Sequence, residues 1–210
     1  EIKTFHSYCF DLLGRVGNLD EAGDVVKQAA EMISNGEVEP NRISKTVLVI
    51  DEAQDMSKDD YALVSALMKA NEEMRVIAVG DDDQNIYEFR GSNSQYLYEL
   101  TQTEHSRFIE MTENYRSVRH IGNAANDFAH NIRQRIKSTP IISMSQEDGE
   151  VRIVKHPYEI QEKKVYMYQP ILEDVTRLLR SNTSKEADAS SRKKNETISI
   201  LTQTNEEAVI

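Results

Sequence analysis

Apolar residues recur at helical spacing in five stretches of the chain, and residues that start or stop helices bound several of them. Gly14 and Gly17 interrupt the first stretch, Asn35-Gly36 ends the second, and Ser57 precedes the third as a candidate N-cap. The pattern predicts helices over residues 5–13, 19–34, 57–70, 94–100 and 118–136.

Two runs of β-branched and aliphatic residues, at 46–50 and 76–79, have no polar interruption. Such runs are typical of strands that are buried on both faces of a parallel sheet. The helix predicted between them completes a βαβ unit, which places the carboxyl ends of both strands at the same edge of the sheet. The apolar residues at 108–111 predict a third strand, which runs on into residues 113–117.

The stretch from 138 to 148 contains Pro140 and lacks a regular pattern, which predicts a domain boundary. Beyond it, the pattern predicts a strand over 151–154, a helix over 165–179 and a strand over 197–201. We therefore expect two domains, over residues 1–137 and 138–210, and the second contains only the start of a fold.

The composition is that of an acidic globular protein. Lys and Arg number 25 and Asp and Glu number 36, so the formal net charge is −11. The chain as a whole therefore lacks the basic footprint of a nucleic-acid binder, and any contact with phosphates needs a local patch. The single cysteine, Cys9, excludes a disulfide framework and fits a cytoplasmic location. No apolar run is long enough for a membrane span, so we expect no membrane partner.

Acidic residues follow both of the predicted buried strands: Asp51-Glu52 after the first and Asp81-Asp82-Asp83 after the second. Ligands of open α/β sheets bind outside the carboxyl ends of the strands, and Mg²⁺ prefers carboxylates, water and phosphate oxygens. This placement favours a magnesium site. An Asp-Glu pair after a strand is also a common helix start, and that alternative stays open.

The aspartate run at 81–83 partly matches the pattern of a calcium-binding loop. Asp81, Asp83 and Asn85 match the first three ligand positions of such a loop. Ile86 stands where the loop requires glycine, and Ser92 stands where it requires the final glutamate. The sequence therefore disfavours calcium.

Four strings occur in order along the chain: TFHS at 4–7, DEAQD at 51–55, GDDDQNIYEFRGS at 80–92 and ENYRS at 113–117. They resemble motifs of the UvrD/Rep family of superfamily 1 DNA helicases, and the resemblance covers most of residues 1–155. A later string, ISILTQTN at 198–205, is similar to a strand of the family's second domain. The resemblance implies an α/β fold of the RecA-like (P-loop NTPase) class, in which helices flank a parallel sheet and a second RecA-like domain begins.

The resemblance also implies an ATP-dependent DNA helicase, with roles for single residues. Asp51 would coordinate Mg²⁺, and Glu52 would act on the hydrolytic water. Gln84 would sense the γ-phosphate of ATP, Tyr115 would stack on the adenine, and Arg116 would reach the γ-phosphate as an arginine finger.

The implied partner is single-stranded DNA or a junction between duplex and single strand. Tyr87, Phe89 and Arg90 are the candidates for contacts with DNA, and Thr4 and His6 for contacts with the strand backbone. The family usually has Trp where this chain has Phe89, so stacking should persist but weaken. Phe89 as a core residue and His6 as a surface residue remain alternatives.

The chain departs from the family pattern because none of its eight glycines is followed by lysine. The loop that cradles the phosphates of ATP, G-x-x-x-x-G-K-[ST], is therefore missing. The family places that loop before the TFHS string, so we expect this chain to be an inactive fragment of a longer protein that acts in DNA repair. The stretch between Ser7 and Asp51 is also short, which indicates a reduced accessory helical insertion. The alternatives are a non-catalytic scaffold that binds nucleotide or DNA, and the motor part of a helicase–nuclease.

Overall fold

The computed structural model describes residues 1–14, 22–86, 91–133 and 135–153, together with residues 173, 176, 177, 199 and 201. The chain divides into two compact units, 1–151 and 152–210. The helix and the strand predicted over 165–179 and 197–201 lie almost wholly outside the described residues. Residues 151–153 have no regular structure, where the pattern predicts a strand. The boundary predicted at residue 138 stays a prediction.

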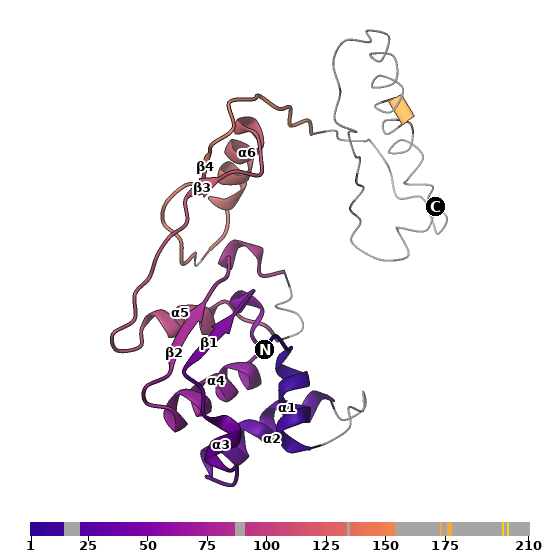
Figure 1. Ribbon diagram of the computed structural model, residues 1–210. Helices are drawn as coiled ribbons and strands as arrows, with labels where there is room; N and C mark the ends of the chain where they lie inside the picture. The colour runs from indigo at the N-terminus through magenta and orange to yellow at the C-terminus, as the bar shows by residue number, and fades with distance from the viewer. Residues whose placement is uncertain are drawn as a thin grey trace, which may run out of the picture. The chain divides into compact units, whose positions relative to one another are not determined.

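Short helices and strands make up the first unit (Figure 1). The helices are α1 (Phe5–Leu13), α2 (Ala22–Ser34), α3 (Pro40–Ile43), α4 (Lys58–Ala70), α5 (Gln95–Thr101) and α6 (Arg119–Ala129), with 3-10 turns η2 (Ala53–Asp55) and η3 (Asp82–Gln84). The strands are β1 (Val47–Ile50), β2 (Arg75–Ala78), β3 (Glu113–Asn114) and β4 (Ile142–Ser143). No helix among the described residues is long and apolar enough to cross a membrane.

Local sequence sets the ends of α1 and α4, as predicted. Thr4 caps α1 through its side chain, and Gly14 ends that helix in the left-handed conformation, with φ 66°. Ser57 and Asp60 form a capping box at α4, in which Asp60 N donates to Ser57 Oγ (3.2 Å) and Ser57 N donates to Asp60 Oδ2 (2.9 Å). Helix α2 begins at Ala22, and the predicted start at residue 19 lies outside the described residues.

The predicted βαβ unit is confirmed. Strands β1 and β2 are parallel, with Val49 opposite Ile77 and Ile50 opposite Ala78, and α4 connects them. The carboxyl ends of both strands therefore lie at one edge of the sheet. This edge carries the two acidic segments that the sequence singled out.

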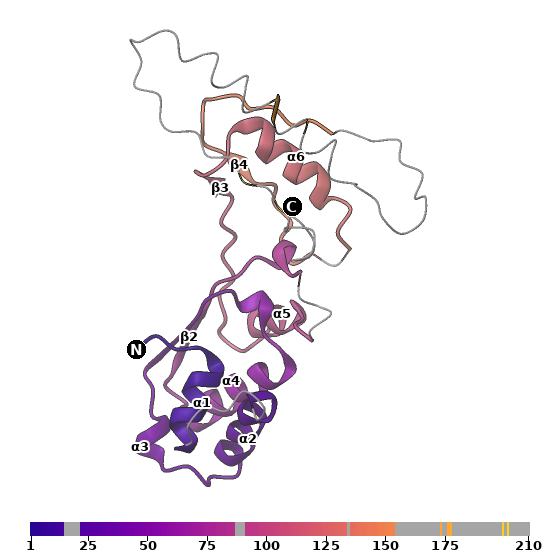
Figure 2. The ribbon, with the colours of Figure 1, turned by 90° about the vertical axis from the view of Figure 1, so that its right-hand side faces the viewer.

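The core lies on one side of this sheet. Figures 1 and 2 show α1, α2 and α4 side by side, and their buried residues form one apolar cluster. Burial raises the pKa of the Cys9 thiol in this cluster to about 12, so the side chain packs as a neutral apolar group. A second cluster joins the sheet to α4 and α5 through Ile50, Val64 and Leu100.

The prediction that both strands are buried on both faces is wrong. Ile50 is 4% exposed, whereas Val49, which points to the other face, is 62% exposed. Val47, Ile77 and Val79 are also about half exposed. Helices α4 and α5 cover only one face, so an uninterrupted apolar run here alternates between a buried and an exposed side.

The predicted third strand is also wrong. Residues 108–111 have no regular structure, and Phe108, Ile109 and Met111 are exposed. Strand β3 is limited to Glu113–Asn114 and pairs in parallel with β4, not with the β1–β2 sheet. An apolar run becomes a strand only where a neighbouring strand takes up its backbone hydrogen bonds, and residues 108–111 have none beside them in the described part.

Helix α6 ends at Ala129, before the predicted end at residue 136. Asn131 N donates to Phe128 O (3.0 Å) and Ile132 N to Ala129 O (3.0 Å), so the backbone tightens into i→i+3 bonds. The residues that follow instead contact the acidic segment after β2.

Candidate functional site

Asp51 and Glu52 directly follow β1, and both side chains are exposed. Glu52 adopts the left-handed conformation, with φ 51°, and its backbone N donates to Asp51 Oδ1 (3.1 Å). A non-glycine residue in this conformation costs on the order of 1 kcal/mol and persists only where its surroundings hold it. The strand therefore turns sharply at the two residues for which the sequence predicts the hydrolytic roles.

Gln54 connects the ends of the two strands. Its side chain is buried, at 2% exposure. Gln54 Nε2 donates to Glu52 Oε2 (2.8 Å), and Gln54 Oε1 accepts from Asp81 N (3.0 Å). A buried amide is stable only when its polar atoms are paired, so Gln54 holds Glu52 and the start of the second acidic segment together. Gln54 is part of the DEAQD string, but no local pattern in the sequence indicates this bridging role.

Gly80 follows β2, which ends at Ala78, and lies close to Gln54. A Cβ atom on this residue would lie 2.6 Å from Gln54 Oε1, 3.0 Å from Gln54 N and 3.1 Å from Leu97 Cδ2. Only glycine leaves room for the Gln54 bridge.

We therefore expect Gly80→Ala to destabilise the chain by about 1–3 kcal/mol, because the backbone of η2 cannot move away from the added methyl group. Urea unfolding of the purified chain measures the change. Gly122→Ala is the matched control, since its Cβ would meet Ser143 Cβ at 3.5 Å, an ordinary contact, and alanine favours the helix. Equal unfolding midpoints for wild type and Gly80→Ala would refute the close approach.

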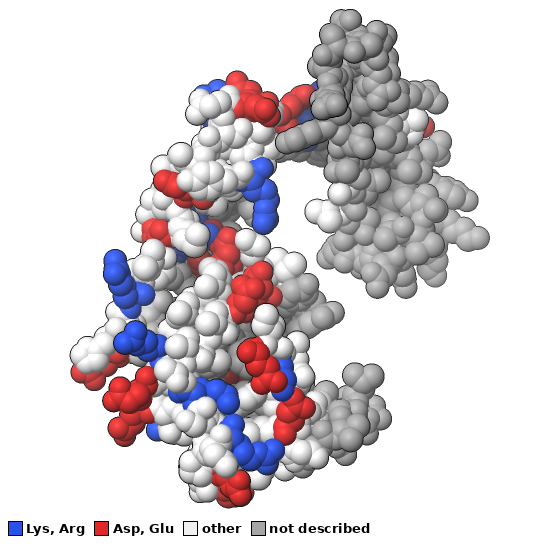
Figure 3. Space-filling view, viewed as in Figure 1, with Lys and Arg blue, Asp and Glu red and all other residues white. Residues whose placement is uncertain are grey.

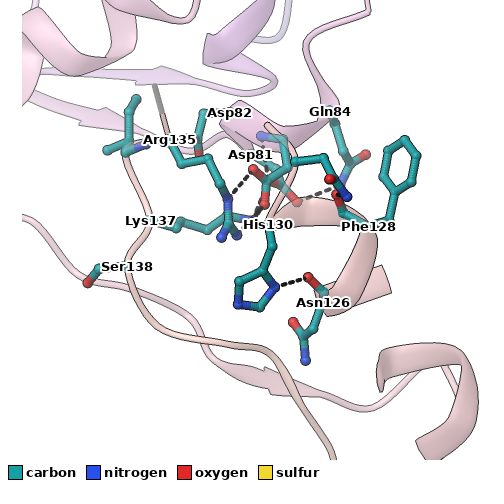
Figure 4. A network of polar contacts seen from close by, with 12 residues as sticks. Asp81, Asp82, Gln84, Asn126, Phe128, His130, Arg135, Lys137 and Ser138 are labelled. Atoms are coloured by element: carbon teal, nitrogen blue, oxygen red, sulfur yellow. Dashed lines mark hydrogen bonds and ion pairs between the residues drawn. The ribbon is translucent and has the colours of Figure 1, made fainter. Parts of the chain in front are cut away.

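The acidic segment after β2 is held by the chain's own cations (Figure 4). Arg135 Nε and Nη2 donate to the two carboxylate oxygens of Asp83, both at 2.7 Å. Ile136 N donates to Asp82 Oδ2 (2.5 Å), and Lys137 Nζ donates to Asp81 Oδ1 (2.5 Å). This run is therefore paired with basic and backbone donors rather than grouped with Asp51 around a cation.

The pairing shifts the pKa values of Asp83 and Lys137. Burial disfavours the charged form of Asp83, but hydrogen bonds from Arg135 and Lys137 outweigh it and hold the pKa of Asp83 below its ordinary value. Burial also opposes the charge of Lys137, and the bonds to Asp81 and Asp83 raise its pKa. The ionised forms therefore predominate at neutral pH.

Asp51 has the chemistry that a magnesium ligand needs. Its side chain is exposed, and among the described residues only Oδ1 accepts a hydrogen bond. No group of three His, Cys, Asp or Glu side chains within the described ranges could hold a metal by itself. A single carboxylate fits Mg²⁺, because this ion takes its remaining ligands from water and substrate phosphates.

Gln84 lies in η3, and its Nε2 donates to Asp81 Oδ2 (2.8 Å). The amide bridge of Gln54 to Asp81 therefore brings Gln84 into the same hydrogen-bonded network as Glu52. Of the residues predicted to surround ATP, the structure brings together Asp51, Glu52 and Gln84.

Tyr115 and Arg116 follow β3 and are exposed. Arg116 N and Ser117 N both donate to Asn114 Oδ1, at 2.9 and 2.8 Å, which shapes the turn. Tyr115 OH donates to Glu113 Oε2 (2.5 Å), and this bond raises the pKa of the phenol. No hydrogen bond or ion pair in the described part joins Arg116 to Asp51 or Gln84.

The predicted DNA contacts are only partly described. Thr4 Oγ1 accepts from Ser7 N (3.1 Å) as a helix cap, and His6 is exposed on α1. Tyr87, Phe89 and Arg90 lie outside the described residues. Figure 3 shows basic and acidic side chains interspersed over the described part of one face.

Comparison with known protein families gives a match that includes the acidic segments after β1 and β2. Residues 18–105 match the family model of the UvrD/REP helicase N-terminal domain. This segment is similar to the N-terminal domain of UvrD/REP helicases, and the match covers less than half of the chain. The matched range contains β1, β2, Asp51, Gln54 and Gln84. The predicted resemblance is thereby confirmed, and the RecA-like class follows from the UvrD/REP family, with which the mixed α/β structure and its parallel strand pairs agree.

Two of three curated relatives of this segment are named ATP-dependent DNA helicases, and the third is a subunit of the RecBCD enzyme. ATP-dependent DNA helicase Rep of Buchnera aphidicola subsp. Schizaphis graminum is 32% identical over 130 residues, which is 60% of this chain and 19% of Rep. ATP-dependent DNA helicase PcrA of Staphylococcus epidermidis is 38% identical over 90 residues, 42% of this chain and 12% of PcrA. RecBCD enzyme subunit RecB of Haemophilus influenzae is 35% identical over 131 residues, 59% of this chain and 10% of RecB. The chain thus spans less than a fifth of the length of each of these relatives.

Proposed function

We propose that this chain is part of an ATP-dependent DNA helicase that couples hydrolysis of Mg-ATP to movement on single-stranded DNA. The observation that carries the proposal is the buried Gln54 bridge within a UvrD/REP segment. It holds Glu52 and the loop of Gln84 at adjacent strand ends, where open α/β sheets bind their ligands.

Each residue at this edge has a chemical task in the proposal. Asp51 would hold Mg²⁺, which neutralises charge on the phosphates when it is bound. Glu52 would orient the attacking water and accept its proton, and Gln84 would respond to the γ-phosphate. The left-handed backbone of Glu52 supports this assignment, since held strain of this kind is concentrated at functional sites.

Tyr115 and Arg116 would complete the nucleotide site from the β3 turn. An exposed aromatic ring suits stacking on adenine, and a permanently charged guanidinium suits a phosphate. No hydrogen bond in the described part joins Arg116 to Asp51. This fits residues that contact the nucleotide only when the site closes.

DNA binding in this proposal depends on local contacts, because the net charge of −11 repels DNA at long range. Tyr87 and Phe89 would stack on bases, at about 1–3 kcal/mol per base, and Arg90 would pair with phosphate. Thr4 and His6 would contact the strand backbone. Single-stranded DNA or a duplex–single-strand junction is the expected substrate, in cytoplasmic DNA repair.

The exposed side of the β1–β2 sheet supports a role within a larger domain. Val49 and Ile77 face each other across the two strands and are 62% and 53% exposed. Parallel sheets normally carry helices on both faces, so this side suits packing against further elements.

We propose that the 210-residue chain alone does not hydrolyse ATP, since it contains no phosphate-cradling Gly-Lys loop. The experiment compares this chain with a longer protein that carries the loop, and measures ATP hydrolysis with Mg²⁺ and single-stranded DNA. We expect DNA-stimulated turnover by the longer protein only. Turnover by the short chain would contradict its predicted inactivity, and no turnover by the longer protein would favour the non-catalytic scaffold.

The motor part of a helicase–nuclease, an alternative from the sequence, is the second candidate. Metal-dependent DNA cleavage by the longer protein, in addition to ATP hydrolysis, would distinguish this candidate from a helicase without a nuclease.

A further inference from the structure

We propose that Arg135 and Lys137 are positioning residues for Gln84, and that they act through the carboxylates of Asp81 and Asp83. The inference rests on the proposed function, because Gln84 is there the residue that responds to the γ-phosphate. The segment 135–137, which we call the clasp, follows α6 and contacts the loop after β2.

The carboxylate of Asp81 is the centre of the clasp. Its Oδ1 accepts from Lys137 Nζ (2.5 Å), and its Oδ2 accepts from Gln84 Nε2 (2.8 Å). Both oxygens are therefore engaged, and the carboxylate cannot turn without breaking one of these bonds. Lys137 thus fixes the partner that orients the amide of Gln84.

Asp83 holds the rest of the loop in place. The planar guanidinium of Arg135 binds it through two parallel hydrogen bonds, and Lys137 Nζ lies 3.0 Å from Asp83 Oδ2. Lys137 therefore bridges Asp81, which precedes η3, and Asp83, which lies within it.

These ion pairs are largely withdrawn from water. The side chains of Asp83, Lys137 and Arg135 are 14%, 17% and 18% exposed, whereas those of the surface pair His105 and Glu104 are about 90% exposed. Charge pairs in such surroundings are screened less by salt than surface pairs. The clasp therefore restrains the loop more firmly than an ordinary surface contact.

The clasp also links Gln84 to the part of the chain that carries Arg116. Helix α6 begins three residues after Arg116, and Asn126 ties it to the segment before β4 through two bonds with Ile141 (2.8 and 3.0 Å). This helix ends at Ala129, and the clasp begins at Arg135. A displacement of the element that presents the arginine finger would therefore reach the γ-phosphate sensor through Lys137 and Asp81.

The test uses the longer protein that carries this chain, with Lys137→Gln and Arg135→Gln. Lys137→Arg keeps the cation and serves as the conservative variant. Arg133→Gln is the matched control, because Arg133 lies just before the clasp, is exposed and makes no hydrogen bond or ion pair with the described residues. The readouts are kcat and KM for ATP with single-stranded DNA, and hydrogen–deuterium exchange of the peptide 81–86.

We expect Lys137→Gln and Arg135→Gln to lower kcat by about 10-fold, with KM for ATP changed less than about 2-fold, and to speed exchange in residues 81–86. Lys137→Arg should recover most of kcat, and Arg133→Gln should match wild type. Loss of folded protein would also lower the apparent kcat at unchanged KM, so kcat is expressed per folded molecule, counted by titration of nucleotide-binding sites. Unfolding would speed exchange throughout the chain, whereas loss of the clasp should speed it mainly in residues 81–86.

Wild-type kcat and exchange in Lys137→Gln would overturn the inference, and so would equal losses in Arg133→Gln. If the wild-type protein hydrolyses no ATP, the proposed function fails, and with it the role of the clasp in hydrolysis. Exchange then still decides whether the clasp holds the loop: faster exchange in Lys137→Gln but not in Arg133→Gln supports the contact, and unchanged exchange overturns it.

Discussion

Arg116→Ala is expected to lower the DNA-stimulated rate of ATP hydrolysis of the longer protein by about 10³–10⁵-fold. Asn114 holds the backbone of Arg116 and Ser117, so the turn presents the guanidinium outward, free to meet a phosphate. The charge that develops on the transferred phosphoryl group is greatest in the transition state, so kcat should fall far more than affinity for ATP. Steady-state kinetics with saturating single-stranded DNA measure the effect.

Two further variants sharpen this test. Arg116→Lys retains the charge but loses the planar fork, so its rate should lie between wild type and Arg116→Ala. Arg107→Ala removes an exposed arginine that makes no hydrogen bond or ion pair among the described residues, and it should leave turnover unchanged. Wild-type turnover in Arg116→Ala would end the assignment of Arg116 as the finger.

Glu52→Gln should lower kcat by about 10²–10⁴-fold, because an amide cannot accept the proton of the attacking water. The substitution keeps a side-chain oxygen that can accept from Gln54 Nε2, as Glu52 Oε2 does at 2.8 Å. We therefore expect little change in stability and retained binding of ATP. Stopped-flow kinetics measure the hydrolysis step, thermal unfolding measures stability, and nucleotide titration measures binding of ATP. Together they distinguish a defect in hydrolysis from a loss of folded protein.

Glu73→Gln is the control for this variant, since it removes a carboxylate from the exposed turn before β2. It should hydrolyse ATP at the wild-type rate. If Glu52→Gln kept kcat within about 3-fold of wild type, the catalytic base would have to be sought elsewhere, because a positioned base contributes more than that.

Local signals predicted much of the fold. The side chain of Ser57 caps α4 and Gly14 ends α1 at the predicted positions, and the parallel pairing of β1 with β2 followed from two apolar runs and the helix between them. Caps, periodicity and glycine stops act over a few residues, so they can be recognised in the sequence alone.

Contacts between distant segments account for the errors. The apolar run at 108–111 forms no strand, since strand formation depends on a partner elsewhere in the chain. The early end of α6 likewise leaves residues 135–137 to contact Asp81, Asp82 and Asp83, which lie more than fifty positions earlier. No local pattern marks such pairs.

For this protein, the sequence alone determined the similarity to UvrD/REP helicases, the βαβ unit and the placement of Asp51, Glu52 and Gln84 after two parallel strands. Only the tertiary structure decided that Gln54 joins those strand ends, that Gly80 makes room for it, and that Arg135 and Lys137 neutralise the aspartates. The reason is physical: motifs and periodicity reflect the chemistry of neighbouring residues, whereas burial and charge pairing depend on which remote segments the fold brings within hydrogen-bonding distance.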